Sequence, residues 1–471
     1  MLMMISKKIA ACACVALATG IFGLQSAQAA IPIQHWVQPS GAQVWLVESP
    51  SIPMLDVLVE FDAGSRRDPA TQAGLADVTA LMAGKGVAAR HGEPALDENQ
   101  LGQAWADLGA SFGASAGADR LSFGLRTLTD PELLQRAVAL AGRELGEPAW
   151  PEAVWQRERE RLSAALRESL TRPGTQAARA FSKAVYGTHP YGYEMTPESL
   201  ARIGVADMRA RYAADVLPCR AHVSLVGAVG RAQADALVTQ LLARLPQGGA
   251  CPALPPVPEV APLAAPQRID IPFDSAQAQV LIGQPGYRRD DPAFFALLVG
   301  NHILGGGGFT SRLMEQVREK RGLSYSVYSA FAPGRNAGAF SVGLQTRPDQ
   351  ADEATRVATA VVQQFVADGP TAAELKAAKD NLIGSFPLRL DSNRKLLDNV
   401  ANIAWNNLPL DYLAHWTERV NAVTAEQIKA AFQRVLQPQN MVTVVVGGAN
   451  QSRQTPGATS SDSASAASPA R

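Results

Sequence analysis

The sequence predicts an α+β protein made of two homologous mixed α/β domains in tandem. The first observation is a repeat, because three short segments of the first half recur in the second half. The pairs are AGSRRD at 63–68 and PGYRRD at 285–290, SFGLRT at 122–127 and SVGLQT at 341–346, and VSLVG at 223–227 and VTVVVG at 442–447. Their glycines are 222, 219 and 220 residues apart. Three offsets this similar indicate a duplication.

The second observation is that each half mixes strand and helix patterns. Alternating or β-branched residues predict strands over 55–61 and 279–283. Helical spacing of apolar residues predicts helices over 131–141, 156–170, 352–366 and 371–383. The repeat is far longer than that of a solenoid, so each half is expected to be a domain.

A proline-rich segment separates the two halves. Seven prolines lie within 246–266, which favours a semi-rigid extended linker between an N-terminal domain at 30–245 and a C-terminal domain at 267–449. The stiffness of this linker should hold the halves in a defined arrangement. Residues 450–471 are rich in Ser, Ala and Thr, and we expect them to form a disordered tail.

The first 29 residues have the pattern of a secretory signal peptide. Lys7 and Lys8 precede an apolar run over 9–24, and Ser-Ala-Gln-Ala at 26–29 provides a small-residue cleavage site. No later segment has 18 consecutive apolar residues, so we expect no membrane span after cleavage. The mature protein is therefore expected in the periplasm, with secretion into the medium as the alternative.

Composition argues against several classes of partner. The chain has 43 Lys and Arg against 43 Asp and Glu, which becomes 41 against 43 without Lys7 and Lys8, a net charge of −2. Since no stretch is rich in Lys and Arg, neither a nucleic acid nor an anionic membrane surface is expected as a partner.

Cys219 and Cys251 remain after cleavage, and the sequence leaves open whether they form a disulfide.

Residues 74–86, GLADVTALMAGKG, carry the first resemblance to a known family. They resemble the zinc-site helix of the pitrilysin/insulinase (inverzincin) peptidases, in the mitochondrial-processing-peptidase-like branch, where this frame reads His-x-x-Glu-His. In that family two histidines one turn apart bind Zn²⁺ and the glutamate activates water. The positions here are Asp77, Ala80 and Leu81. The best match to the family's third ligand is Glu168, for which we favour a solvated or ion-paired helix residue. We predict that this chain binds no catalytic zinc and no other cofactor.

The strongest functional signal is in the second half. LGGGGFTSRL at 304–313 and VREKRGLSYSVY at 317–328 resemble the family's C-terminal segment, whose arginine and tyrosine face the zinc site. The matching residues are Arg318 and Tyr325. The resemblance implies that they hold a substrate carbonyl and stabilise its oxyanion. Glycines follow Leu304 at four consecutive positions, Gly305, Gly306, Gly307 and Gly308, without the Gly-Lys-Ser/Thr of a phosphate loop. We expect a mobile loop that contacts extended peptide, with neighbouring strand edges offering main-chain hydrogen bonds.

A further family segment is HPYG at 189–192, where we favour a turn histidine with satisfied hydrogen bonds. Together these features favour division of labour between homologous chains. This chain would be the metal-free subunit, a homologous partner would carry His-x-x-Glu-His and the zinc, and peptides or unfolded polypeptides would be the substrates. The alternative is a catalytically silent structural or peptide-binding scaffold of the same family. A third hypothesis, a self-sufficient peptidase, is disfavoured because Ala80 offers no base and Leu81 no ligand.

Overall fold

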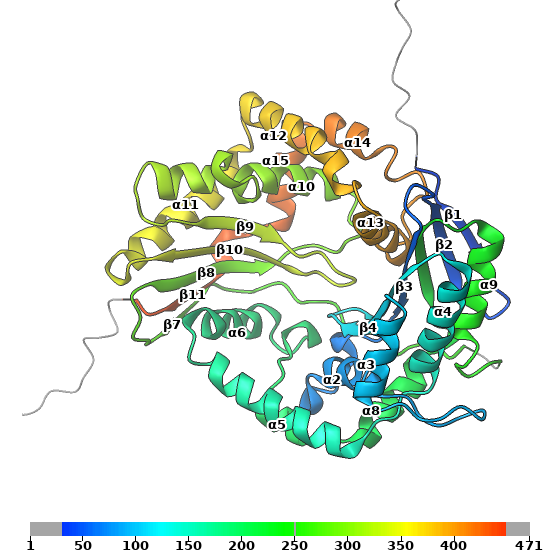
Figure 1. The fold of residues 1–471 in the computed structure, drawn as a ribbon. Coiled ribbons are helices and arrows are strands. Elements are labelled where there is room, and N and C mark those ends of the chain that lie inside the picture. Colours follow the sequence, from blue (N-terminus) through cyan, green and yellow to red (C-terminus); the bar gives the residue numbers. More distant parts are fainter. Residues whose placement is uncertain (1–30, 249–250, 449–471) are drawn as a thin grey trace, which may run out of the picture.

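Two β-sheets organise the computed structural model, which describes residues 31–248 and 251–448 (Figure 1). The first sheet has the strand order β1-β2-β6-β3-β5-β4, and the second has the order β7-β11-β8-β10-β9. The first-sheet strands are β1 (Gln34–Val37), β2 (Gln43–Glu48), β3 (Met54–Phe61), β4 (Ser111–Ala116), β5 (Leu121–Leu128) and β6 (His222–Gly227). The second-sheet strands are β7 (Gln267–Ile271), β8 (Ala278–Pro285), β9 (Val327–Phe331), β10 (Ala339–Thr346) and β11 (Val442–Val446). The predicted signal peptide and tail lie outside the described residues.

The two sheets have corresponding strand pairings. β3 lies antiparallel between β5 and β6, and β8 lies antiparallel between β10 and β11. β6 then pairs in parallel with β2, as β11 does with β7. The first pair of repeated segments lies at the ends of β3 and β8. The second pair lies in β5 and β10, and the third pair lies in β6 and β11. The topology therefore repeats where the sequence repeats.

The N-terminal half, residues 31–248, also contains helices, some of which pack on the first sheet. They are α2 (Leu75–Ala83), α3 (Glu98–Asp107), α4 (Pro131–Gly146), α5 (Glu152–Ser169), α6 (Pro173–Tyr186), α7 (Pro197–Ala201), α8 (Val205–Asp215) and α9 (Arg231–Leu242). Local sequence explains several of their starts: Asp97 and Gln100 form a capping box on α3, and Asp130 caps α4 just before Pro131. Phe61, Phe123 and Trp155 are fully buried in the core of this half.

The C-terminal half, residues 267–448, has the same layered construction. Its helices are α10 (Phe294–Asn301), α11 (Ala351–Asp368), α12 (Ala372–Gly384), α13 (Asn393–Trp405), α14 (Trp416–Ala422) and α15 (Ala425–Val435). Thr371 and Glu374 form a capping box on α12. The core contains Phe340, Phe365 and Phe432. The strands predicted at 55–61 and 279–283 and the four predicted helices are confirmed by β3, β8, α4, α5, α11 and α12.

Each half lends one helix to the sheet of the other half. α6 packs on β8 and β11, and α13 packs on β2, β3 and β6 (Figure 1). The α6 contact is apolar, because Phe181 and Val185 pack with Val442 and Val444. The α13 contact includes charged groups: the ring centroid of Trp405 lies 4.9 Å from the guanidinium carbon of Arg120 and 4.8 Å from that of Arg335. The exchanged helices join the two halves.

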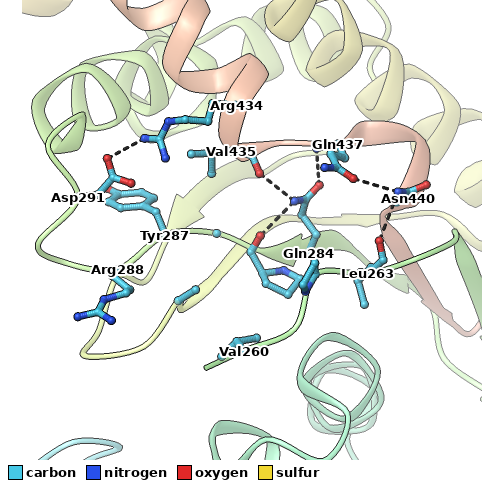
Figure 2. A pocket seen from close by; sticks show the side chains of 14 residues that line it. Val260, Leu263, Gln284, Tyr287, Arg288, Asp291, Arg434, Val435, Gln437 and Asn440 are labelled. Atoms are coloured by element: carbon cyan, nitrogen blue, oxygen red, sulfur yellow. Dashed lines mark hydrogen bonds and ion pairs between the residues drawn. The ribbon is translucent and has the colours of Figure 1, made fainter. Parts of the chain in front are cut away.

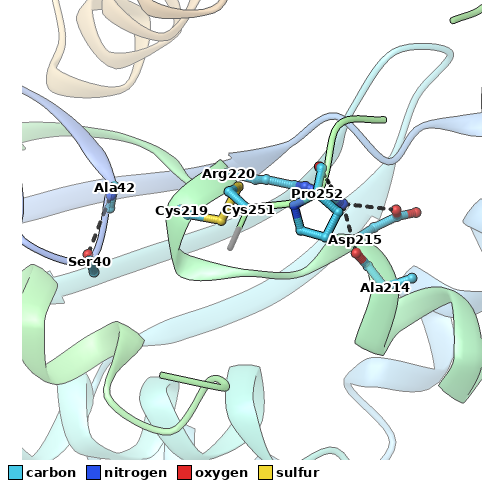
Figure 3. The surroundings of a disulfide bond; sticks show 8 residues. All are labelled: Ser40, Ala42, Ala214, Asp215, Cys219, Arg220, Cys251 and Pro252. Carbon is cyan, nitrogen blue, oxygen red and sulfur yellow. Dashed lines mark hydrogen bonds and ion pairs between the residues drawn. A yellow bond between two sulfur atoms is a disulfide. The ribbon is translucent and has the colours of Figure 1, made fainter. Parts of the chain in front are cut away.

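The described parts of 246–266 contain neither helix nor strand. Cys219 and Cys251 form a disulfide, which answers the question that the sequence left open (Figure 3). Next to it, Arg220 donates to the carbonyl oxygen of Pro252 at 2.6 Å. Further along, Arg67 donates to the carbonyl oxygen of Pro255 at 2.8 Å. The beginning of this segment is therefore attached to the N-terminal half.

The next part of the segment contacts both halves. The carbonyl oxygen of Pro258 accepts hydrogen bonds from His189 at 2.9 Å and from the Asn336 amide at 3.1 Å. Glu259 forms an ion pair with Arg288 at 2.6 Å. Proline stiffness and these contacts act together to fix the path of the segment.

The described helices include none with the length and apolar character needed to cross a bilayer.

Candidate functional site

The helix α2 carries the frame in which the family places its zinc ligands. Its first turn is capped by Asp68, whose carboxylate accepts hydrogen bonds from the backbone N–H groups of Gly74 and Ala76, each at 3.1 Å. Burial raises the pKa of Asp68 to about 6, although these two hydrogen bonds favour the charged form. The helix is thus formed and held in place without any metal ligand.

The three frame positions do not form a metal site. Asp77 is exposed, Ala80 is buried in the core, and Leu81 is half-buried. Glu168 lies exposed on α5 and forms an ion pair with Arg172 at 2.7 Å, which agrees with the ion-paired role favoured from the sequence. Across residues 31–248 and 251–448, no three His, Cys, Asp or Glu side chains are grouped so that they could hold a metal ion. The side chains of this frame therefore do not fit a catalytic zinc.

Arg318 lies on a π-helix, Met314–Glu319, in the C-terminal half. The same segment is anchored by Arg312, which donates to Glu374 at 2.7 Å and to the carbonyl oxygen of Gly369 at 2.9 Å. Burial alone would raise the pKa of Glu374, but hydrogen bonds from Arg312 and Thr371 lower it to about 2. The ion pair with α12 therefore persists at any ordinary pH and fixes the start of the Arg318 segment. Wide helical turns of this kind are frequent at functional sites.

Tyr325 is held in an exposed position by its buried neighbours. The Ser324 hydroxyl lies 2.6 Å from the carbonyl oxygen of Gln345, and the Thr346 hydroxyl donates to the carbonyl oxygen of Leu323 at 2.5 Å. Both bonds tie the chain to the end of β10. Leu323 and Ser324 are buried, whereas Tyr325 is 80% exposed. The backbone thus presents the phenol ring to solvent.

The structure brings Arg318 and Tyr325 together. The guanidinium carbon of Arg318 lies 4.6 Å from the ring centroid of Tyr325. Among the described residues no carboxylate forms an ion pair with Arg318. A charged guanidinium beside a tyrosine ring, with no acid among the described residues to neutralise it, is suited to donate hydrogen bonds to a carbonyl oxygen or an oxyanion.

The backbone of the four-glycine run is largely helical, whereas a mobile loop was expected. Gly305 and Gly306 complete a π-helix, His302–Gly306, while Gly308 begins a 3₁₀ turn, Gly308–Thr310. Gly305 is buried, and a Cβ atom there would lie 2.4 Å from the backbone nitrogen of Ser329 in β9. The loop expectation was wrong because close packing on β9, which only glycine permits, holds this backbone in a helix. Gly306 and Gly308 remain exposed.

The packing on β9 also affects the strand edge that was expected to offer hydrogen bonds to a peptide. β9 is an edge strand of the second sheet. At its centre, the Asn301 amide donates to the carbonyl oxygen of Ser329 at 3.2 Å, and the Ser329 hydroxyl donates to the Asn301 side-chain oxygen at 2.8 Å. An added peptide strand that pairs with the Ser329 carbonyl would have to displace the bond from the Asn301 amide.

A cavity of about 600 Å³ lies between the halves, away from the Arg318 segment. It is lined by the turn that joins β4 to β5, by the turn that joins β9 to β10, and by side chains that include Glu60, Arg120 and Tyr191. Asp77, Arg318 and Tyr325 do not line it. Within this chain, therefore, the degenerate frame and the Arg/Tyr pair do not share this cavity.

A smaller cavity of about 320 Å³ lies between residues 260–263 and the C-terminal half (Figure 2). Its central polar group is the Gln284 amide, which donates to the carbonyl oxygen of Val435 at 3.1 Å and accepts from the backbone nitrogen of Gln437 at 2.7 Å. Asp291 and Arg434 form an ion pair at 2.7 Å at its rim. These polar groups already satisfy one another, so the cavity is explained as part of the packing.

His189 has the structural role that the sequence favoured. Its Nδ1 atom accepts from the backbone nitrogen of Tyr191 at 3.1 Å, and its Nε2 atom lies 2.9 Å from the carbonyl oxygen of Pro258. A carbonyl only accepts, so Nε2 carries the proton of a neutral ring. Burial lowers the pKa of His189, which keeps the ring neutral. The prediction of a turn histidine with satisfied hydrogen bonds is confirmed.

Phe309 belongs to the Arg318 site, although the sequence gave it no role. Its ring centroid lies 4.7 Å from the guanidinium carbon of Arg318, on a side chain that is 64% exposed. An aromatic residue directly after a glycine run was the only available signal. The contact itself spans nine residues and depends on two irregular helices, which periodicity does not predict.

The fold and the site together define a class of protein: a peptidase-like chain of two related halves whose zinc frame lacks ligands. Comparison with known proteins agrees. The sequence matches the peptidase M16 inactive-domain family over residues 202–382. The crystal structure of a peptidase M16 inactive domain from Pseudomonas fluorescens is 34% identical, with alignment covering 88% of this chain and 98% of that chain and a TM-score of 0.83.

Two curated relatives differ in what their names say. An uncharacterized zinc protease of Mycobacterium leprae is 27% identical, over 84% of this chain and 88% of its own length. A non-peptidase homolog of Helicobacter pylori is 32% identical, over 33% of this chain and 36% of its own length. The chain belongs to the peptidase M16 inactive-domain family.

Proposed function

We propose that this chain is the metal-free subunit of an exported, two-subunit peptidase of the mitochondrial-processing-peptidase-like branch. A homologous partner carries His-x-x-Glu-His and the zinc, and the substrate is a peptide or an unfolded polypeptide. The observation that carries the proposal is a contrast within one chain. The α2 frame has no metal ligand at Ala80 or Leu81, whereas the half-buried Arg318 lies beside the exposed Tyr325 and forms no ion pair with an acid among the described residues.

In the complex, Arg318 and Tyr325 would act on the substrate carbonyl in trans. As the carbonyl oxygen gains negative charge during hydrolysis, the guanidinium and the phenol O–H donate hydrogen bonds to it. Such donors accelerate the reaction because they bind the developing charge more tightly than the neutral carbonyl. The exposed glycines Gly306 and Gly308 would let the peptide backbone approach the same surface.

Membership of an inactive-domain family supports the metal-free assignment, and the relative named as a zinc protease supports a link to peptide hydrolysis. The Cys219–Cys251 disulfide supports export, since disulfides persist in oxidising compartments. The relative named as a non-peptidase homolog favours the second candidate, a silent structural or peptide-binding scaffold. Cell fractionation, with N-terminal sequencing of the mature chain, tests the periplasmic location and cleavage after residue 29.

The test of function is turnover by the pair reconstituted with its zinc-motif partner. Arg318→Ala should reduce kcat by about 100-fold, the usual effect of removing one oxyanion donor, while the complex still assembles. Arg321→Ala is the matched control, because Arg321 is an exposed arginine three residues away that bonds only to Gln316 among the described residues. Equal turnover of Arg318→Ala and wild type would refute the assigned role and favour the scaffold.

A further inference from the structure

The Arg318 guanidinium lies close to two aromatic rings. Its central carbon lies 4.7 Å from the ring centroid of Phe309 and 4.6 Å from that of Tyr325. Both distances fall within the range of cation–π attraction. The resemblance to the peptidase family accounts for Arg318 and Tyr325, but it assigns nothing to Phe309.

The position of Phe309 follows from the turn that carries it. Gly308 has a backbone φ of +63°, and the space around it is open, so the preceding glycine permits a turn that other residues would strain. The turn is then closed by Ser311, whose buried hydroxyl donates to the carbonyl oxygen of Gly308 at 2.7 Å. Thr310 adds a bond to the carbonyl oxygen of Gly307 at 3.1 Å. Phe309 therefore lies over Arg318 because the turn is fixed there.

Phe309 contributes little to the protein core, since its side chain is 64% exposed. The exposed position of this phenyl ring is better explained by its contact with Arg318, a cation that forms no ion pair among the described residues. A ring beside a long cationic side chain restricts its rotamers and covers part of the apolar surface of the guanidinium, while the N–H groups stay free to donate.

We propose that Phe309 is a positioning residue for Arg318. Phe309 and Tyr325 hold the guanidinium with its N–H edge toward the substrate carbonyl before the substrate arrives. This inference rests on the proposed function of Arg318. Because the arrangement is formed in advance, it acts on the step in which charge develops and changes kcat more than KM.

The experiment uses the same reconstituted pair. Phe309→Ala should lower kcat about two- to fivefold, the range expected for an exposed cation–π contact, with little change in KM. Phe309→Tyr should restore the rate because it keeps a ring. Phe309→Leu should not, since leucine keeps apolar volume but has no π face. In an Arg318→Ala background, Phe309→Ala should have no further effect.

A second measurement needs no partner. In the isolated full chain labelled at arginine, the ring currents of Phe309 and Tyr325 should shift the side-chain NMR signals of Arg318 upfield. Phe309→Leu should remove part of that shift, and Arg321 provides the unstacked reference. An unchanged Arg318 signal in Phe309→Leu would overturn the contact.

The experiments distinguish a failure of the proposed function of Arg318 from a failure of the positioning role of Phe309. If Arg318→Ala turns over like wild type, the proposed function is wrong whatever Phe309 does. If Arg318→Ala is impaired but Phe309→Leu matches wild type, Arg318 acts as proposed and the positioning role of Phe309 is refuted. The same conclusion follows if the effects of Arg318→Ala and Phe309→Ala on kcat are additive in the double variant.

Discussion

Glu144 gives a prediction in which stability and pH are linked. This glutamate is 4% exposed on α4 and accepts a hydrogen bond from the Trp105 indole at 2.8 Å. Burial raises its pKa from an ordinary value of 4.5 to about 7, although the indole bond favours the charged form. The folded chain therefore keeps a proton on Glu144 between pH 4.5 and 7, where the unfolded chain loses it.

The sign and size of the effect follow from that difference. The stabilising contribution of protonated Glu144 is complete below pH 4.5 and is lost as the pH rises through 7. The two pKa values differ by between two and three pH units, and at about 1.36 kcal/mol per unit the full loss is about 3 kcal/mol. Only the smaller part of this contribution is lost by pH 5, so about 2–3 kcal/mol remains to be lost by pH 8.

Glu144→Gln removes the charge and keeps an acceptor for Trp105. Its free energy of unfolding relative to wild type should therefore increase by about 2–3 kcal/mol between pH 5 and pH 8. Urea denaturation at both values, followed by tryptophan fluorescence, measures this directly. Glu168→Gln is the control, because Glu168 is exposed and its effect should be small at both pH values. The same difference between Glu144→Gln and wild type at pH 5 and pH 8 would refute the reasoning.

Two further predictions concern covalent and close-packed contacts. The Cys219–Cys251 disulfide closes a loop with a sequence separation of 32, so Cys219→Ser with Cys251→Ser should lower the free energy of unfolding by about 3–4 kcal/mol. Wild type in reducing buffer should match this variant, and urea curves unaffected by reductant would contradict the estimate. Gly305→Ala should destabilise by about 1–3 kcal/mol, since its Cβ atom would lie 2.4 Å from the Ser329 nitrogen. Gly384→Ala has no atom within 4 Å to meet, and a thermal melt that places both alanine variants at one Tm would contradict the packing argument.

Much of the fold could be predicted from the sequence because the repeats and periodicities are local. The glycine offsets near 220 predicted two related units, and the sheets have matching strand orders. The exchange of α6 and α13 could not be predicted, since a helix period identifies an apolar face but not the sheet that covers it. The Cys219–Cys251 bond was equally open, because sequence spacing does not determine whether two Cα atoms approach to 6.1 Å.

The candidate site was predictable in part for a similar reason. The residue types at Ala80 and Leu81 were sufficient to argue against zinc, because aliphatic side chains have no donor atoms and Asp77 alone cannot supply a ligand set. The contact between Arg318 and Tyr325 agrees with their shared segment. Phe309 was missed because its contact with Arg318 depends on a turn at Gly308 and on a π-helix, and both are fixed by tertiary packing.

The most direct test of the central claim is native mass spectrometry of the mature chain purified from its own cell envelope, with the metal content measured on the same sample. The account predicts a one-to-one complex with a homologue that carries His-x-x-Glu-His, one zinc per complex, and none in the separated chain. Zinc bound stoichiometrically by this chain alone, or an assembly in which no chain carries that motif, would contradict it.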